Sequence, residues 1–236
     1  MLQPEQAPPS EPEIAALFRS ILPYGVFVHG GPIAAPLTTL FDSEYELVRS
    51  AVTKRQREFA AGRHYAHLAL ASAGFRPAPI HPAPDRGPIW PSDIVGSISH
   101  TDYCAVAAVA SASILTALGI DLEHRVSLAP NVIALIADRD ERALWNDNKL
   151  PIELRDSTAP LTFSAKEAVF KAYYPKFRRR ISFGDIQIRY TGVPSRFCVQ
   201  APQLPDPDQS FLASVEGRFA ITTNYIATVA LVLRCT

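Results

Sequence analysis

The sequence has no CxxC pair and too few cysteines for a disulfide framework. Its three cysteines, Cys104, Cys198 and Cys235, lie far apart. An odd number at this spacing fits reduced thiols better than disulfide bonds or a zinc site. We therefore expect a cytoplasmic protein.

The sequence also lacks a long apolar run. No stretch approaches the ~18 apolar residues of a membrane span. The N-terminus, MLQPEQAPPSEPE, is acidic and rich in proline, and it has no basic start followed by an apolar segment. We expect the protein to be neither secreted nor embedded in a membrane.

An excess of charge of one sign is absent as well. The 23 Lys and Arg residues balance the 23 Asp and Glu residues, so the whole chain has no field that attracts nucleic acid or an anionic membrane. Apolar residues, in contrast, make up 47% of the 236 residues. This content is ample for the core of one large domain or two small ones.

Helical and extended patterns alternate along the chain and predict an α+β fold. In the first part we expect a flexible tail over 1–12, a strand within 22–30, a helix from Asp42 or Ser43 to Ala73 with a break near Thr53, irregular structure over 77–91, and neighbouring strands at 97–111 and 114–123. In the second part we expect helices over 138–147 and from Pro160 to Pro175, then strands within 181–190, 195–202, 210–223 and 225–234.

Each half, 13–113 and 114–236, therefore mixes helices with strands. We predict two similar halves related by a pseudo-twofold axis, each with a small, mostly antiparallel sheet packed with helices.

Two carboxylates in the segment GIDLEH point to a cation site. Residues two apart on a strand face the same side, so Asp121 and Glu123 are expected to lie together while Ile120 and Leu122 pack on the other side. The alternative is a solvated strand edge.

The helix TFSAKEAVFKAYYP carries a further acid and a lysine on one face. Glu167 and Lys171 are four residues apart. A carboxylate from this helix, added to the two strand acids, would give an all-oxygen site suited to Mg²⁺ and substrate phosphate, with the lysine beside it. The alternative is an intrahelical ion pair without a function.

Two further features suggest phosphate binding. The turn GSISHTD offers hydroxyls, backbone N–H groups and an imidazole, with Ser99 and His100 at its centre. On the long helix, Arg55 and Arg63 are about two turns apart and so lie near one face. A structural histidine and a solvated helix face are the alternatives.

The motifs GSISH, GIDLE and FSAKEAVFKA, preceded by REFAAGRHYA, occur in this order over residues 55–175. Together they closely resemble the phosphopantetheinyl transferases of the surfactin and enterobactin type. The resemblance implies transfer of the phosphopantetheine arm of coenzyme A to a serine of a carrier protein, with Mg²⁺ required and adenosine 3',5'-bisphosphate released. It also implies a monomer that holds coenzyme A between its two halves.

The resemblance assigns roles to individual residues. Asp121, Glu123 and Glu167 resemble the metal ligands, and Lys166 and Lys171 are expected to serve the diphosphate. Glu167 and Lys171 are the expected catalytic residues. The expected coenzyme A contacts around the 3'-phosphate and the adenine are Ser99, His100, Arg55, Arg63 and Arg86.

The chain departs from the family pattern at three points. The tryptophan that many members have shortly before GID is missing from 115–118, Ala168 replaces the familiar serine after KE, and Leu122 offers no side-chain oxygen between the two acids. An Mg²⁺-dependent phosphohydrolase or nuclease, and a coenzyme A binding module without catalysis, remain the alternative functions.

A basic cluster follows the helix that carries Glu167. Lys176, Arg178, Arg179 and Arg180 should emerge together if Pro175 ends that helix. They could steer the acidic helix of a carrier protein toward the site, or they could form a solvated turn.

Overall fold

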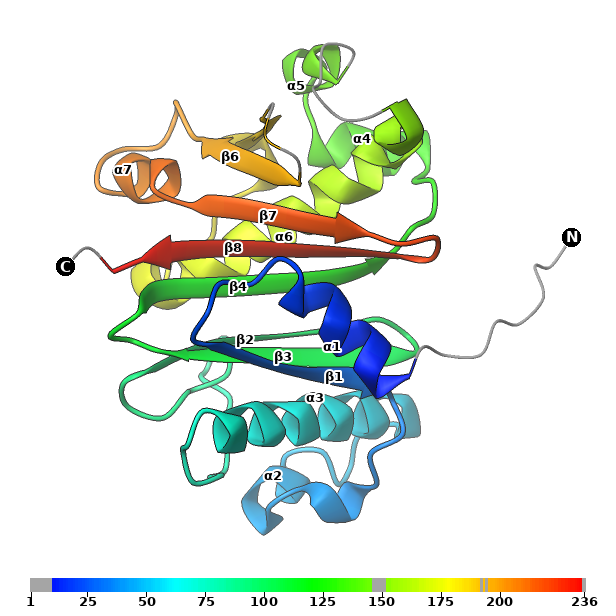
Figure 1. Ribbon diagram of the computed structural model, residues 1–236, viewed down its shortest axis with the longest axis vertical. Helices are drawn as coiled ribbons and strands as arrows, with labels where there is room; N and C mark the ends of the chain where they lie inside the picture. Colours follow the sequence, from blue (N-terminus) through cyan, green and yellow to red (C-terminus); the bar gives the residue numbers. More distant parts are fainter. Residues whose placement is uncertain (1–9, 146–151, 192, 194, 235–236) are drawn as a thin grey trace, which may run out of the picture.

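The computed structural model describes residues 10–145, 152–191, 193 and 195–234 (Figure 1). Its helices are α1 (Glu11–Arg19), α2 (Asp42–Glu46), α3 (Thr53–Ser72), α4 (Pro130–Ile136), α5 (Arg139–Leu144), α6 (Thr158–Phe177) and α7 (Asp208–Ala213), with 3-10 helices η1 (Leu37–Thr39), η2 (Ile152–Ser157) and η3 (Phe183–Asp185). Its strands are β1 (Val26–Pro32), β2 (Ile94–His100), β3 (Cys104–Ser111), β4 (Leu115–His124), β5 (Gln187–Tyr190), β6 (Arg196–Gln200), β7 (Glu216–Ile221) and β8 (Tyr225–Leu233).

The strands form two antiparallel sheets. One has the order β1-β3-β2 and the other the order β4-β8-β7-β6-β5. Figure 1 shows α3 against the three-stranded sheet and α6 behind the five-stranded sheet. The predicted α+β fold with two such halves is confirmed.

Strand β3 is buried on both faces, and its alternating residues serve two cores. Ala105, Ala107 and Val109 pack against α3, which meets them largely with alanines. Val106 and Ala108 face the other way, toward α1 and the apolar side of β4 and β8. Because most of these side chains are small, the helix and the sheets approach closely.

The two sheets meet along β2 and β4, and two serines join them there. The amide of Ile120 donates to Ser97 Oγ at 3.1 Å, and the amide of Leu122 donates to Ser99 Oγ at 3.3 Å. Serine hydroxyls thus take the place of the carbonyls of a regular ladder. We call this contact between β2 and β4 the seam.

The structure corrects the predicted strand pairing. Residues 97–111 are not one strand: β2 and β3 form a hairpin, and Thr101 caps its turn by accepting from the amides of Tyr103 and Cys104. The predicted neighbouring strands at 97–111 and 114–123 do lie side by side where β2 meets β4 at the seam, but they do not pair within one sheet, because β3 pairs with β1 and β2 whereas β4 pairs with β8. The short turn at 112–114 therefore crosses between sheets.

Two other predictions need correction. Helix α6 runs through Pro175 to Phe177 and ends where Arg178 adopts a left-handed φ of 52°. Proline is tolerated here because it lies in the last turn of the helix. The predicted strand at 210–223 is α7 followed by β7.

Other features agree with the sequence. The chain leaves the helical conformation between α2 and α3, as predicted for the region near Thr53, and 77–91 holds only an isolated bridge between Pro82 and Pro88. Helix α1 was not predicted and begins at Glu11, at the end of the expected tail.

Residues 1–9, 146–147 and Cys235 lie outside the described residues. Among the helices that are described, none has the length and apolar character needed to cross a bilayer.

Candidate active site

Helix α6 crosses β4 at unusually close range, and Gly119 makes this possible. A Cβ added at Gly119 would overlap the backbone carbonyl oxygen of Ala168 and approach the amide nitrogen of Ala172 to 2.6 Å. The glycine of GIDLE thus lets the backbone of α6 lie on the strand. This contact sets Glu167 and Lys171 over the acids of β4.

The Asp121 carboxylate accepts hydrogen bonds from three side chains of the site. It is 3% exposed, and its Oδ1 accepts from Lys171 Nζ at 2.6 Å and from Ser99 Oγ at 2.9 Å. Its Oδ2 accepts from Ser164 Oγ at 2.8 Å. Side chains from β2, β4 and α6 therefore converge on one carboxylate at the seam.

Glu123 and Glu167 lie close enough to Asp121 to feel its charge. Burial, and then the Asp121 carboxylate, raises the pKa of Glu123 to about 7, although Lys171 opposes the shift. Burial also raises the pKa of Glu167, again with repulsion from Asp121. The three acids therefore lie near enough to repel one another, and Lys171 balances this repulsion incompletely. Their role as a metal-binding set stays a prediction.

The side chains of Asp121, Glu123 and Glu167 form an all-oxygen donor set. Within the described part of the chain, no group of three or more His, Cys, Asp and Glu side chains has the arrangement to hold a metal ion. The chemistry nevertheless fits a hard divalent cation, because the buried Asp121 and the half-buried Glu123 and Glu167 offer only oxygen ligands, and burial together with repulsion from Asp121 raises the pKa of both glutamates.

The predicted arginines lie on α3 around an aromatic ring. The Arg63 guanidinium carbon lies 4.4 Å from the centroid of Phe59, and that of Arg55 lies 5.9 Å from it. Burial, assisted by repulsion from Arg55 and opposed by the charge of Glu44, lowers the pKa of Arg63 to about 10. Arg55 is exposed. Two guanidinium groups that share one ring form a spot that attracts an anion.

His100 lies at the same end of the molecule as Arg55. It is exposed at the end of β2, and the adjacent Asp102 accepts from Lys54 Nζ of α3 at 2.7 Å. Arg86 lies in an exposed loop with a φ of 72°. An ion pair between Asp85 and Arg178, 3.0 Å long, ties this loop to the end of α6.

Two predicted coenzyme A contacts need correction. Lys166 is 0% exposed, and its ammonium donates to the carbonyls of Ile136 and Phe183 and to Glu141 Oε2 at 2.6–2.7 Å. All three protons are used inside the protein, so none is left for the diphosphate.

The Ser99 hydroxyl is also engaged internally. It donates to Asp121 and accepts from the Leu122 amide and from Lys171 Nζ at 3.0 Å. Its neighbour His100 points to the other side of β2 because successive side chains on a strand alternate. Ser99 therefore positions Asp121 and Lys171 rather than facing the phosphate spot with its side chain.

Sequence reasoning did not identify Gly119 and Ser164 as site residues. The signal was available, since both are small residues within the motifs GIDLE and FSAKE. His67 is a buried partner of Glu44 at 3.1 Å.

The basic cluster after α6 is partly used within the fold. Arg178 pairs with Asp85, Arg179 pairs with the buried Asp208, and Lys176 lies 5.1 Å from the centroid of Phe211. Arg180 forms no hydrogen bond or ion pair with any residue that the structure describes. Much of the expected free positive charge is therefore already paired, and the role of the cluster in docking a carrier protein stays a prediction.

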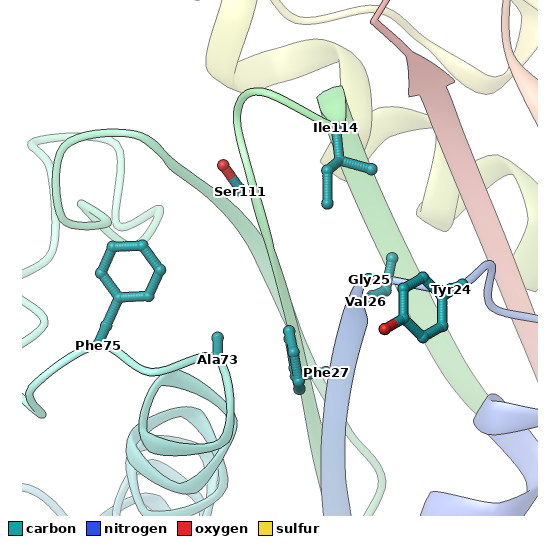
Figure 2. A pocket seen from close by; sticks show the side chains of 8 residues that line it. All are labelled: Tyr24, Gly25, Val26, Phe27, Ala73, Phe75, Ser111 and Ile114. Carbon is teal, nitrogen blue, oxygen red and sulfur yellow. The ribbon is translucent and has the colours of Figure 1, made fainter.

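A pocket of about 420 Å³ opens at the opposite end of the molecule (Figure 2). It lies at the start of β1, the end of α3 and the turn between β3 and β4, whereas His100, Glu123 and Arg55 lie at the other ends of their elements. Its lining carries no charged side chain: Tyr24, Gly25, Val26, Phe27, Ala73, Phe75, Ser111 and Ile114. An apolar pocket of this kind does not suit a phosphate.

Fold and site together define a two-sheet α+β protein with an acid cluster and a lysine at the seam and an arginine pair on the neighbouring helix. Residues 43–110 match the family model "4'-phosphopantetheinyl transferase N-terminal domain", and 117–230 match the model "4'-phosphopantetheinyl transferase superfamily". The chain belongs to the 4'-phosphopantetheinyl transferase superfamily, which confirms the resemblance found in the motifs.

Individual relatives agree. The chain is 33% identical over 195 residues to 4'-phosphopantetheinyl transferase Svp of Streptomyces mobaraensis, which covers 82% of this chain and 78% of Svp. It is 31% identical over 230 residues to 4'-phosphopantetheinyl transferase PptT of Mycobacterium tuberculosis, covering 91% and 97% of the two chains. The chain is also 40% identical over 135 residues to enterobactin synthase component D of Salmonella typhimurium. This match covers 55% of this chain and 53% of the other.

Proposed function

We propose that this protein transfers the 4'-phosphopantetheine group of coenzyme A to a serine of an apo carrier protein. The carrier would be an acyl, peptidyl or aryl carrier of fatty acid, polyketide or nonribosomal peptide synthesis. The observation that supports this proposal most strongly is the convergence of Asp121, Lys171 and Ser99 at the seam, with Glu123 and Glu167 beside them.

In the proposed reaction the carrier serine hydroxyl loses its proton, which is released, and its oxygen forms a bond to the phosphorus next to pantetheine. The bond from that phosphorus to the bridging oxygen breaks, and adenosine 3',5'-bisphosphate leaves. Lys171 donates to Asp121 and Ser99, so one of its three protons remains for the diphosphate. Its charge would stabilise the phosphoryl oxygens as the bond breaks.

The basic spot on α3 would bind the other end of coenzyme A. Arg55, Arg63 and His100 would contact the 3'-phosphate, and Arg86 would lie near the adenine. Support comes from the stacking of both arginines on Phe59 and from the position of His100 at the same end of the sheet. The first half, 13–113, would then bind coenzyme A, and the second, 114–236, would supply the acids and Lys171.

We also propose that the reaction needs Mg²⁺, held by Asp121, Glu123 and Glu167. A bound Mg²⁺ would offset the negative charge of the phosphoryl oxygens. The raised pKa values of Glu123 and Glu167 support this role, because a cation would relieve the repulsion that keeps protons on them. That the enzyme is a monomer and cytoplasmic stays a prediction.

Intact-mass measurement tests the function. An apo carrier protein incubated with coenzyme A, Mg²⁺ and this enzyme should become heavier by one phosphopantetheinyl group. Glu123→Gln and Glu167→Gln should each remove most of this activity. The control is Glu46→Gln, because Glu46 is exposed and forms a surface ion pair with Arg49. Full turnover after chelation of divalent metal would contradict the metal assignment.

The same experiment separates the other functions. A phosphohydrolase would release inorganic phosphate from simple nucleotides and leave the carrier mass unchanged. A binding module without catalysis would bind coenzyme A and do neither.

A further inference from the structure

A further buried acid, Glu44, lies in the first half, away from the carboxylates at the seam. Glu44 is 0% exposed in the short helix α2. Its Oε1 accepts from the Ile80 amide at 2.8 Å and lies 3.1 Å from His67 Nε2, while its Oε2 accepts from the Phe41 amide at 3.1 Å. One carboxylate thus ties together α2, α3 and the proline-rich segment at 77–91.

These contacts keep Glu44 charged. Burial alone would raise the pKa of this carboxyl, but the hydrogen bonds from His67 and from the Ile80 and Phe41 amides together lower it. A fully enclosed acid is rare in proteins unless its oxygens are satisfied, as they are here. Glu44 does not contact Asp121, Glu123 or Glu167. Its hydrogen bonds are all made within the first half, so we look for its role there.

The neighbour that Glu44 organises is Arg63. Arg63 Nε donates to the Ile80 carbonyl at 2.9 Å and lies 3.8 Å from Glu44 Oε1. The backbone of Ile80 is therefore held from both sides, its N–H by Glu44 and its C=O by Arg63. Phe59 covers the face of the guanidinium at 4.4 Å.

This arrangement fixes which edge of the guanidinium points inward. Because the Nε edge is used by Ile80, the two terminal amino groups form the remaining edge, the one that binds a phosphate with two parallel hydrogen bonds. Glu44 also supplies the negative charge that offsets the burial of Arg63 and its repulsion by Arg55. Without Glu44, neither the Ile80 segment nor the buried arginine is held in this way.

We propose that Glu44 is a positioning residue for Arg63, and that through Ile80 it sets the preference of the enzyme for coenzyme A over dephospho-coenzyme A. This proposal rests on the proposed function, in which Arg63 binds the 3'-phosphate. Glu44 does not touch the ligand itself.

The test measures binding of both ligands by titration calorimetry and uses the ratio of their affinities. Arg63→Ala should reduce the preference for coenzyme A on the order of 10- to 100-fold, as expected for loss of a charge-assisted hydrogen bond. Glu44→Gln, which keeps the shape but removes the charge, should reduce it about three- to tenfold through loss of an ordinary hydrogen bond. In the Arg63→Ala background, Glu44→Gln should change the ratio no further.

The matched control is Glu141→Gln, because Glu141 is a buried carboxylate of the other half that pairs with Lys166 at 2.6 Å. It should lower the melting temperature, as Glu44→Gln does, without changing the affinity ratio. If Glu44→Gln fails to fold, His67→Leu removes one hydrogen-bond partner of Glu44 and should shift the ratio in the same direction by a smaller factor.

The outcomes separate the two proposals. If Arg63→Ala leaves the ratio unchanged, the proposed phosphate contact itself is wrong. If Arg63→Ala lowers the ratio but neither Glu44→Gln nor His67→Leu does, Glu44 is not a positioning residue. An equal effect of Glu44→Gln with and without Arg63 would also overturn the proposal.

Discussion

Helices α3 and α6 are each 20 residues long and each covers one sheet, yet they present opposite charges. Helix α3 carries Arg55 and Arg63 around Phe59, whereas α6 brings Glu167 toward Asp121 and Glu123. Both rest on their sheet through small residues, with alanines at the contact. The comparison shows that two helices that pack on their sheets in a similar way can favour different ligands, an anion beside α3 and a cation beside α6, because of the charged residues on one face of each.

The two helices also differ in how those charges are balanced. On the α3 side, hydrogen bonds lower the pKa of the buried Glu44 in spite of its burial. On the α6 side, burial and mutual repulsion raise the pKa values of Glu123 and Glu167. The α6 side is therefore the one that gains most from an added cation, and the α3 side the one that suits an added anion.

The largest effect is expected from a substitution that separates α6 from the five-stranded sheet. Gly119→Ala should abolish transfer and lower stability by roughly 3 kcal/mol or more, because its Cβ would overlap backbone atoms that cannot move aside. Urea denaturation measures the change. Gly184→Ala is the control, since the nearest atom to its Cβ would be Ser182 Oγ at 3.8 Å. Equal stability of the two variants would contradict the proposed close packing.

A smaller change removes the cation of α6 that pairs with Asp121. Lys171→Met should lower stability by roughly 2–3 kcal/mol, because it leaves the buried Asp121 carboxylate without its ion pair. Adding Asp121→Asn should restore part of this loss, since the unpaired charge is then gone. The comparison is made by denaturation of both variants without divalent metal. A double variant that is less stable than Lys171→Met would argue against the pairing.

The unbalanced charge on the α6 side predicts a pH effect. The pKa of Glu123 is about 7 in the folded protein, above its ordinary value of 4.5, so the native state holds the proton longer than the unfolded state. The free energy of unfolding should therefore fall as pH rises from 4.5 to 7. Glu123→Gln should be more stable than wild type at pH 8 by roughly 2 kcal/mol and nearly equal to it at pH 4.5. Thermal melts in the presence of a chelator measure the difference in stability between the two proteins. A difference that does not change with pH would show that the pKa of Glu123 is not raised in the folded protein.

The smallest effect is expected from the basic cluster. Arg180→Glu should raise the KM for the carrier protein about two- to fivefold at low salt, with little effect at high salt, because the contribution is electrostatic steering. Affinity for coenzyme A should stay the same. Arg179→Glu is a contrast rather than a control, since it also breaks the ion pair to buried Asp208 and should lower stability. An unchanged KM for Arg180→Glu would exclude steering by this residue.

The sequence predicted the convergence of the acids because it depends on local geometry. Strand alternation places Asp121 and Glu123 on one side, and helical spacing places Glu167 and Lys171 on one face. Helix α1 could also have been predicted, since the SEPE motif begins it and the Glu13 carboxylate accepts from the Ser10 amide at 2.6 Å.

What could not be predicted depends on distant partners. Lys166 adjoins Glu167 in sequence, but its acceptors come from α4, α5 and η3. The engagement of Ser99 with Asp121 depends on how two sheets meet. The sequence around Glu44 carries no pattern that predicts its burial, because its partners include backbone amides from separate segments.

The division of tasks between the helices is tested most directly by kcat/KM for coenzyme A and for dephospho-coenzyme A in wild type, Arg63→Ala and Glu167→Gln, with carrier modification followed by mass. We predict that Arg63→Ala lowers kcat/KM for coenzyme A and leaves that for dephospho-coenzyme A nearly unchanged. Glu167→Gln should lower both by the same large factor. Equal losses with both ligands for Arg63→Ala, or a loss confined to coenzyme A for Glu167→Gln, would contradict the account.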